Sequence, residues 1–490
     1  SGDRQQQQRP QMSLVEAGDR ASDYRFDTLK VRGAYNPTEH NNAFSVPIYQ
    51  TTSFEMGDTA RGERLFRQEE LGFLYSRVGN PTIDVFERRV AELDGASAAV
   101  ALASGMAAVS YSVLNLADSG ERIVASPYLY GGSYDLFKSI LPRYGITVDI
   151  ATSLDPRAFQ ALIGSATKAV FIESIANPKG YVADIEAFAQ LAHDNGLPLI
   201  VDNTFATPYL IQPFKHGADV VVYSATKGLS GHGNIVAGLI LESGKFNYGS
   251  GRFAQFTDKA FTLRDRDERH RSFLEVFPET PFTARVRLSL LNYLGATLSP
   301  FNAYLALLGL ETLSERIEKQ LANVRAVIAY LQQSEHVAWI DYAELPDSPN
   351  HDLAARYAPR GPGAIFAFGF KGTLEQQERF IDSTRLFSYQ VNVGDARSLI
   401  VNNAKTTHSE LTLEEQRASG LPPETIRLSL GLEDPRDLIA DLDQAFRAVF
   451  DTATADAGVV ASTAALSPVG NVDRATSSTT DDSTVVPQAP

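Results

Sequence analysis

Short apolar runs rich in β-branched residues alternate with amphipathic segments through the middle of the chain. Several of the runs are separated by helical patterns, among them 156–166 and 184–196. Strands that lack polar alternation are buried on both faces, and strands that alternate with helices form a mostly parallel sheet. The pattern therefore predicts an α/β domain with strands at 98–104, 122–126, 147–152, 168–174, 197–204, 218–227 and 235–242.

The pattern changes from about residue 286. A long helical stretch leads to strand patterns at 363–372 and 425–434, which predicts a smaller α+β domain reached through a helix that both domains share. Both ends of the chain carry few large apolar groups and cannot offset their ordering entropy. We therefore divide the chain into a disordered segment 1–22, an N-terminal arm 23–80, a large domain 81–285, a C-terminal α+β domain 286–450 and a disordered tail 451–490.

Composition narrows the class of protein. A formal net charge of -15 argues against a nucleic-acid binder, and we interpret the mixed-sign run 264–272 as a solvated loop or helix. The lack of cysteine excludes thiol catalysis and a disulfide framework, which fits a cytoplasmic protein. No apolar stretch is long enough to predict a membrane span. His232 and His408 have no companion at metal-ligand spacing, so we expect no metal.

Candidate chemistry lies just after the predicted strands, where ligands bind in α/β sheets. The turn 104–108 consists mostly of small residues, and N–H groups at such a helix start can hold a phosphate. Asp202 ends another strand, where it is an N-cap, an internal hydrogen-bond acceptor or a counter-charge for a protonated ring; the residue alone leaves these three interpretations open. Lys227 follows Ser224 and Thr226, and its interpretations are a solvated cap, a phosphate ligand or a nucleophile.

These groups make most sense together. A phosphate anchor, a buried carboxylate and a lysine at adjacent strand ends are what pyridoxal 5'-phosphate requires. In that interpretation Asp202 keeps the pyridine nitrogen protonated, so that the ring accepts electrons, and Lys227 forms the Schiff base. The order and spacing of the residues therefore predict a pyridoxal-phosphate enzyme.

The segment "VDNTFATPYL" followed by "GADVVVYSATKGLSGHG" resembles the signature of the Cys/Met-metabolism pyridoxal-phosphate enzymes, a branch of the fold-type-I superfamily. "LYSRVGNPT", "LASGMAA", "LYGGSYDLF" and "ESIANPKG" also match, and the similarity runs from about residue 26 to 448. Within the family, "ATLSPFNAYLALLGLETLSER" and "VNVGDARSLIVNNAKTTHSELT" are most similar to O-acetylhomoserine sulfhydrylases. The resemblance implies a large pyridoxal-phosphate domain, an N-terminal arm and a smaller C-terminal domain.

The resemblance implies a role for each matching residue. Lys227 is the Schiff-base lysine and proton shuttle, Asp202 pairs with the pyridinium nitrogen, and Tyr130 stacks on the ring and assists proton transfer at the leaving group. Arg427 binds the substrate α-carboxylate through a bidentate pair that guanidinium supplies well. Asn392 is a further substrate-binding residue.

The resemblance also implies how the cofactor is held. Tyr75 and Arg77 of the arm reach the phosphate of a neighbouring subunit, with Tyr75 also near the substrate, and Asn177 lies near the phenolic oxygen of the ring. The site then needs at least a dimer, and the family resemblance implies a homotetramer built as a dimer of dimers. The phosphate ligands from the same subunit are Gly105, Met106, Ser224 and Thr226.

Some positions depart from the family pattern. Tyr223 stands where the family usually has His, a change that we expect to be tolerated. Gly132 stands where methionine γ-lyases carry Cys, which argues against that activity. The implied reaction is γ-replacement on O-acetyl-L-homoserine, in which sulfide displaces acetate and L-homocysteine forms. The alternatives are replacement by another thiol, amine or carbon nucleophile, a γ-lyase that gives 2-oxobutyrate, and a homologue without catalysis.

Overall fold

The computed structural model describes residues 24–176, 180–406, 412–418 and 420–451. Its largest element is a seven-stranded sheet with the order β1-β9-β8-β7-β4-β2-β3. Four pairings are parallel, and β9 runs antiparallel to both β1 and β8. Each predicted strand run overlaps one of the strands, which confirms the α/β fold class. The strands are β1 (Ala98–Leu102), β2 (Arg122–Ala125), β3 (Thr147–Ile150), β4 (Thr167–Glu173), β7 (Leu199–Asp202), β8 (Val220–Ser224) and β9 (Gly238–Glu242).

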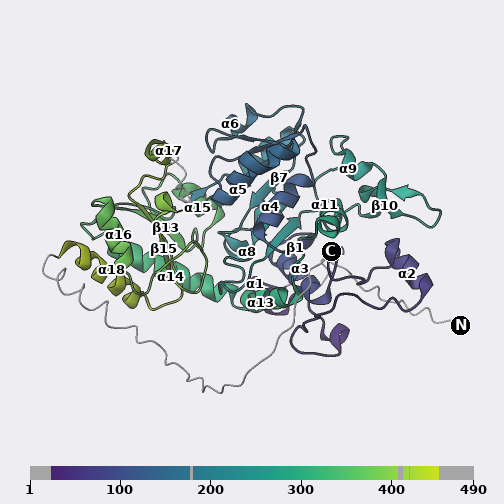
Figure 1. Ribbon diagram of the computed structural model, residues 1–490, viewed down its shortest axis with the longest axis horizontal. Helices are drawn as coiled ribbons and strands as arrows, with labels where there is room; N and C mark the ends of the chain where they lie inside the picture. The colour runs from purple at the N-terminus through teal and green to yellow at the C-terminus, as the bar shows by residue number, and fades with distance from the viewer. Residues whose placement is uncertain (1–23, 177–179, 407–411, 419, 452–490) are drawn as a thin grey trace, which may run out of the picture.

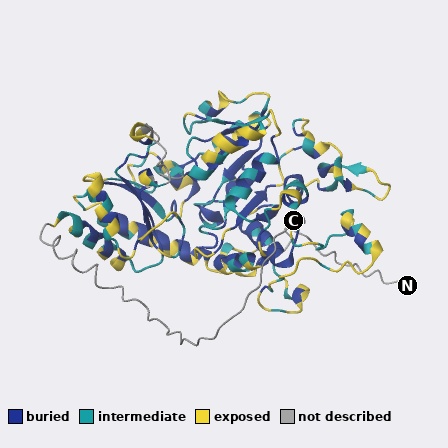
Figure 2. Cartoon of the chain, viewed as in Figure 1, coloured by how far each residue is buried: buried dark blue, intermediate teal, exposed yellow. Residues whose placement is uncertain are grey.

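Helices cover both faces of this sheet because successive strand residues point to opposite sides. Val221 of β8 belongs to one buried cluster, whereas Val220 and Val222 belong to a second. Helices α3 (Pro81–Asp94) and α7 (Ile185–Asp194) complete the first cluster. Helices α4 (Gly105–Leu114) and α11 (Pro281–Arg285) complete the second. Figure 2 shows the buried residues gathered along the sheet between these layers.

One helix of the large domain is shorter than its pattern predicts. The predicted helix 156–166 is wrong beyond residue 160, because α6 spans only Pro156–Gln160. Gly164 donates its N–H to the Thr167 hydroxyl at 2.9 Å, which turns the chain into β4. The remaining elements of this region are β5 (Ile175–Ala176), β6 (Tyr181–Val182), α5 (Gly131–Asp135) with its continuation through 136–144, α8 (Thr207–Leu210), a 3₁₀ turn (Pro213–His216), α9 (Ala254–Thr257) and α10 (Phe273–Val276).

The long helical stretch predicted from residue 286 is three helical pieces rather than one. The segment after α11 continues through 286–291 and α12 (Asn292–Leu294) and ends at Gly295, whose φ is 81°. Helix α13 (Pro300–Glu311) restarts with Ser299 as N-cap and proline in its first turn, and α14 (Leu313–Leu331) follows Thr312. Glycine in the left-handed region ends a helix and proline begins one, so the break follows from local chemistry.

Helix α14 joins the two sheets. Its first half contributes Leu313, Ile317 and Leu321 to a cluster of the large sheet, and Val324 begins the cluster of the smaller sheet. The smaller sheet has the order β12-β13-β16-β15-β14 and is antiparallel except for β14 with β15. Figure 1 shows it at one end of the molecule. Its elements are β12 (Val337–Asp341), α15 (His351–Tyr357), β13 (Ile365–Phe370), α16 (Leu374–Ser383), β14 (Ser388–Tyr389), β15 (Leu399–Val401), a 3₁₀ turn (Asn403–Lys405), α17 (Leu413–Ala418), β16 (Thr425–Ser429) and α18 (Pro435–Phe450).

In the N-terminal part of the chain, α1 (Phe26–Arg32) packs against α3 and α13, and a 3₁₀ turn (Pro37–His40) follows it. Helix α2 (Thr59–Phe66) lies at the end of the molecule opposite the smaller sheet (Figure 1). The mixed-sign run 264–272 is mostly a loop, as one of the two interpretations expected, and its ends belong to a hairpin of β10 (Ala260–Arg264) and β11 (His270–Arg271). Arg266 at its tip pairs with Glu69 beyond α2 at 2.8 Å. The tails predicted to be disordered lie, apart from Asp451, outside the described residues.

Candidate active site

A cavity of about 230 Å³ opens at the carboxyl ends of β4, β7 and β8. Its walls come from the large sheet and from two segments of the C-terminal part of the chain, near 391–393 and at Arg427. Most of the predicted site residues line this one cavity. The lining residues among them are Gly105, Met106, Tyr130, Asp202, Ser224, Thr226, Lys227, Asn392 and Arg427.

The start of α4 forms one wall. Ser104 is the N-cap and accepts from the N–H of Ala107 at 3.0 Å. A Cβ on Gly105 would lie 2.5 Å from the Ser224 Cβ, so only glycine lets the helix start meet the end of β8. The first N–H groups of a helix and its macrodipole attract an anion. With Ser224 and Thr226 on the same cavity, this wall fits a phosphate.

Asp202 ends β7, in register with Glu173 of β4 and Val222 of β8. Its carboxylate accepts from the hydroxyl of Thr204 at 2.6 Å and from the backbone N–H of the same residue at 3.0 Å. Loss of hydration raises the pKa of Asp202 to about 6, and the bonds from Thr204 oppose that rise. A cation beside this carboxylate would favour its ionised form, as a protonated ring nitrogen does.

Lys227 lies in the turn after β8. Its Nζ donates to the Asn392 Oδ1 at 2.8 Å. Desolvation lowers the pKa of the Lys227 amine, and the positive charge of Arg427 lowers it further. The neutral amine, which is the nucleophilic form, is thereby favoured.

Arg427 comes from β16 of the smaller sheet, between Ala367 of β13 and Val401 of β15. It is buried, with 3% of its surface exposed. Burial lowers the pKa of Arg427 to about 10. A guanidinium in such a cavity suits a carboxylate, because its planar donors match the two oxygens.

Tyr130 lies half exposed on the cavity wall, at the start of α5. Its backbone N–H donates to Glu173 Oε1 at 2.5 Å. A Cβ on Gly132 would lie 2.5 Å from the Tyr130 Cε1, so glycine at this position leaves space for the phenol ring. Larger residues at 132 are therefore incompatible with this position of the Tyr130 ring.

Two of the predicted residues that the structure describes, Tyr75 and Arg77, do not line the cavity of this subunit. Tyr75 and Arg77 lie exposed on the arm, where the guanidinium stacks 4.7 Å from the tyrosine ring centre. Arg77 also donates to the Asn292 carbonyl at 3.0 Å. Asn177 and His408 lie outside the described residues. His232 contacts the carbonyl of Ser230 at 2.6 Å through Nδ1.

Sequence reasoning missed Glu173, which is buried at the end of β4 and lines the cavity. The rule that selected Asp202, a carboxylate that ends a buried strand, applies equally to Glu173. Sequence reasoning also missed the apolar residues that line the cavity, because an apolar side chain gives no chemical signal in the sequence. These are Val109, Ile175, Phe205, Val236, Val391 and Val393.

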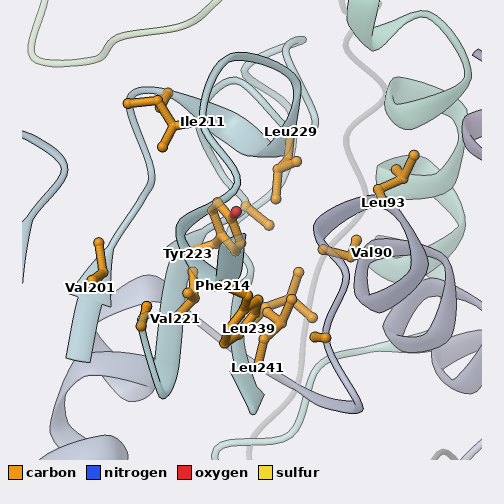
Figure 3. Packing of buried hydrophobic residues seen from close by; sticks show 14 of the residues in the cluster. Val90, Leu93, Val201, Ile211, Phe214, Val221, Tyr223, Leu229, Leu239 and Leu241 are labelled. Carbon is orange, nitrogen blue, oxygen red and sulfur yellow. The ribbon is translucent and has the colours of Figure 1, made fainter. Parts of the chain in front are cut away.

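Tyr223 is fully buried among apolar side chains of the large sheet, as Figure 3 shows. Its hydroxyl donates to Asp94 of α3 at 2.6 Å and accepts from Asn203 at 2.8 Å. Asn203 in turn accepts from the Ser174 hydroxyl at 2.7 Å. Tyr223 therefore joins the strand ends beneath Asp202 and Ser224 to helix α3.

An amine with a lowered pKa, a carboxylate and a phosphate-sized cradle meet at the carboxyl end of a mostly parallel sheet. This fold and site define a pyridoxal-phosphate enzyme of fold type I, and the cavity residues fit that cofactor. The chain belongs to the Cys/Met metabolism PLP-dependent enzyme family, whose sequence profile matches residues 27–447.

The chain aligns with named relatives over nearly the whole length of those proteins. The chain is 40% identical over 428 residues to the "Sulfhydrylase FUB7" of Fusarium oxysporum, covering 87% of this chain and 98% of that protein. It is 42% identical to the "O-acetyl-L-homoserine sulfhydrylase 1" of Thermus thermophilus, covering 86% and 99%. A crystal structure of a putative O-acetylhomoserine (thiol)-lyase from Campylobacter jejuni has a TM-score of 0.82 and 38% identity, covering 86% of this chain and 100% of that one. It carries a pyridoxyl-lysine monophosphate at its position 205.

Within the described ranges, no helix is both long and apolar enough to cross a membrane. The described residues also contain no group of three or more His, Asp or Glu side chains that would hold a metal ion.

Proposed function

We propose that this protein catalyses γ-replacement on O-acetyl-L-homoserine, with sulfide displacing acetate to give L-homocysteine. One observation carries the proposal: Lys227 and the buried Arg427 line the same cavity. An amino acid whose carboxylate binds Arg427 would place its α-carbon within reach of that amine. The names of the Fusarium, Thermus and Campylobacter relatives support the same reaction.

Three side chains have distinct roles in this proposal. Bound pyridoxal phosphate supplies the electron sink that stabilises negative charge at the substrate α-carbon. Lys227 holds the cofactor and, once released, takes the α-proton, which its lowered pKa favours. Asp202 pairs with the ring nitrogen, and Arg427 orients the substrate through its carboxylate. Gly105, Met106, Ser224 and Thr226, all on the cavity wall, would hold the cofactor's phosphate.

The replacement itself occurs at the γ-carbon. After loss of protons from the α- and β-carbons, the γ C–O bond breaks and acetate leaves with the bonding electrons. Hydrosulfide then forms the new C–S bond at the γ-carbon, and the α- and β-carbons regain protons. Tyr130, half exposed on the cavity wall, assists proton transfer at the leaving oxygen, and Asn392 holds the amine of Lys227 near the reacting carbons.

A neighbouring subunit completes the site in this proposal. Tyr75 and Arg77 lie exposed on the arm and away from the cavity of their own chain, which leaves them available to the phosphate of a second copy. We therefore propose a homotetramer built from two such dimers, located in the cytoplasm. Light scattering on the purified protein tests the assembly, and a monomer with full activity would contradict it. Fluorescence microscopy of the tagged protein tests the location.

The cofactor attachment is tested by absorbance. The wild type should show the visible band of lysine-bound pyridoxal phosphate, and Lys227→Ala should lack it. Lys168→Ala is a suitable control, because Lys168 lies at the start of β4 and its amine binds the Arg252 carbonyl at 2.7 Å. A wild type without the band would overturn the proposal.

The reaction is tested with O-acetyl-L-homoserine with and without sulfide. Homocysteine formed only with sulfide supports the proposal, and 2-oxobutyrate formed without sulfide would establish the lyase alternative instead. A panel of thiols, amines and carbon acids then identifies the preferred nucleophile. A nucleophile with much higher kcat/KM than sulfide would reassign the physiological reaction.

A further inference from the structure

One face of helix α14 carries three buried polar side chains, Arg316, Gln320 and Asn323. Their spacing of four and then three residues places them in one row along the helix. Buried polar groups are costly unless they form hydrogen bonds. The nitrogen atoms of each of the three donate to backbone carbonyls, and each side chain reaches a different segment near the cavity.

Arg316 binds the loop that carries the lysine. Its guanidinium donates to the carbonyls of Gly228 at 2.9 Å, Leu229 at 3.2 Å and Gly309 at 2.7 Å. A Cβ on Gly231 would lie 1.8 Å from an Arg316 nitrogen, so the loop is shaped around the guanidinium. Among the described residues no carboxylate forms an ion pair with this side chain. The backbone just after Lys227 is therefore its chief partner.

Gln320, one turn further along the helix, binds the loop that carries Asn392. Its Nε2 donates to the carbonyl of Asp395 at 3.0 Å. The next residue, Ala396, donates its N–H to the Gly231 carbonyl at 2.9 Å, which ties this loop to the lysine loop. A Cβ on Gly394 would lie 2.7 Å from the Gly228 nitrogen, so the two loops also pack closely.

Asn323 binds the segment after β16, the strand that carries Arg427. Its Nδ2 donates to the carbonyls of Gly431 at 2.9 Å and Glu433 at 2.8 Å. Leu432, between them, donates to the carbonyl of Ala396 at 2.8 Å. The row on α14 thus holds three segments that also bind one another.

We propose that Arg316, Gln320 and Asn323 are positioning residues of the active site. They place Lys227, Asn392 and Arg427, which lie on three separate segments, in one arrangement at the cavity. This inference rests on the proposed attachment of the cofactor at Lys227, but on no particular amino-acid substrate. The helix that joins the two sheets therefore also sets the position of the amine relative to the guanidinium.

The test compares Arg316→Met and Gln320→Met with the wild-type holoenzyme. Because the substitutions displace the lysine loop and the asparagine loop, we expect kcat to fall about tenfold or more, with KM changed about twofold at most. We also expect a weaker visible circular dichroism per bound cofactor, since that signal reports how the cofactor is oriented at the lysine. Arg316→Lys, which keeps the charge but fewer donors, should be intermediate. Gln320→Met keeps the test valid if Arg316→Met fails to fold, because it removes only one hydrogen bond.

Arg89→Met is the matched control. Arg89 is also buried, 1% exposed, and donates to the Gly33 carbonyl at 2.9 Å, outside the cavity. It should lose thermal stability but keep the wild-type kcat and circular dichroism. If the α14 variants match this control, the inference is overturned even where the wild type shows the cofactor band. A wild type without the band would instead contradict the proposed function.

Discussion

The Nζ of Lys227 lies 2.8 Å from the Oδ1 of Asn392, across 165 residues of sequence. The lysine follows a strand of the large sheet, and the asparagine belongs to the smaller domain. This hydrogen bond joins the two domains directly at the amine that is proposed to carry the cofactor. The titration of the amine is therefore sensitive to the residue at position 392.

Asn392→Asp should move the pH profile. A carboxylate at this distance favours the charged amine and raises the pKa of Lys227, opposing the lowering by desolvation and Arg427. Activity that depends on the neutral amine rises with pH, and this rise should move to higher pH by about one unit. Activity at neutral pH should then be about tenfold lower. Measurement of kcat at saturating substrate against pH checks this, because the amine of Lys227 is free only in the enzyme–substrate complex. Asn392→Ala, which adds no charge, should not shift the profile upward, and an unshifted profile in Asn392→Asp would contradict the argument.

Asp202→Asn should change the pH dependence of stability of the cofactor-free protein. Desolvation raises the pKa of Asp202 from 3.8 to about 6. A raised folded-state pKa means that stability is fully present below the unfolded value and is lost as pH rises through the folded value. As pH rises from about 4 to 6, the wild type should therefore lose on the order of 3 kcal/mol of stability through Asp202, and the variant should not.

Thermal unfolding of both cofactor-free proteins from pH 4 to 7 measures this difference. Other buried acids, such as Glu87 and Glu242, have a pKa raised to about 7 and are common to both proteins, so their effect cancels. Parallel curves for the two proteins would show that Asp202 does not titrate in this range.

Gly132→Ala should impair the position of Tyr130. The added Cβ would lie 2.5 Å from the Tyr130 Cε1, so the ring must move. We expect kcat to fall about tenfold, because small displacements of a positioned group are costly. Gly164→Ala is the matched control, since no atom lies within 4 Å of its Cβ position. Equal activity of the two variants would show that the ring adapts without cost.

Tyr223→Phe should destabilise the protein by about 1–3 kcal/mol. The loss leaves the buried Asp94 and Asn203 without the hydroxyl that bonds to both of them. Burial raises the pKa of Asp94 to about 7, and the bond from Tyr223 opposes that rise. Denaturant unfolding measures the change in the free energy of unfolding. A variant as stable as the wild type would mean that water or a rearranged Asn203 replaces the hydroxyl.

The strands of the large sheet and two of the catalytic candidates were predictable from local pattern. Continuous apolar runs identify buried strands, and the strand-end rule selects Asp202 and Lys227 without any knowledge of pairing. The same rule also reaches Glu173. By contrast, the end of the predicted helix at Gln160 depends on a turn contact between Gly164 and Thr167, which hydrophobic periodicity does not register.

The sequence alone determined the α/β class, the cofactor and the residues at the strand ends, because these depend on local periodicity and on the spacing of a few polar groups. Only the tertiary structure decided that Arg427 and Asn392 meet Lys227 at one cavity, and that a row of side chains on α14 holds their loops. Those contacts join segments far apart in the chain. Their geometry depends on how two domains pack, which no local pattern specifies.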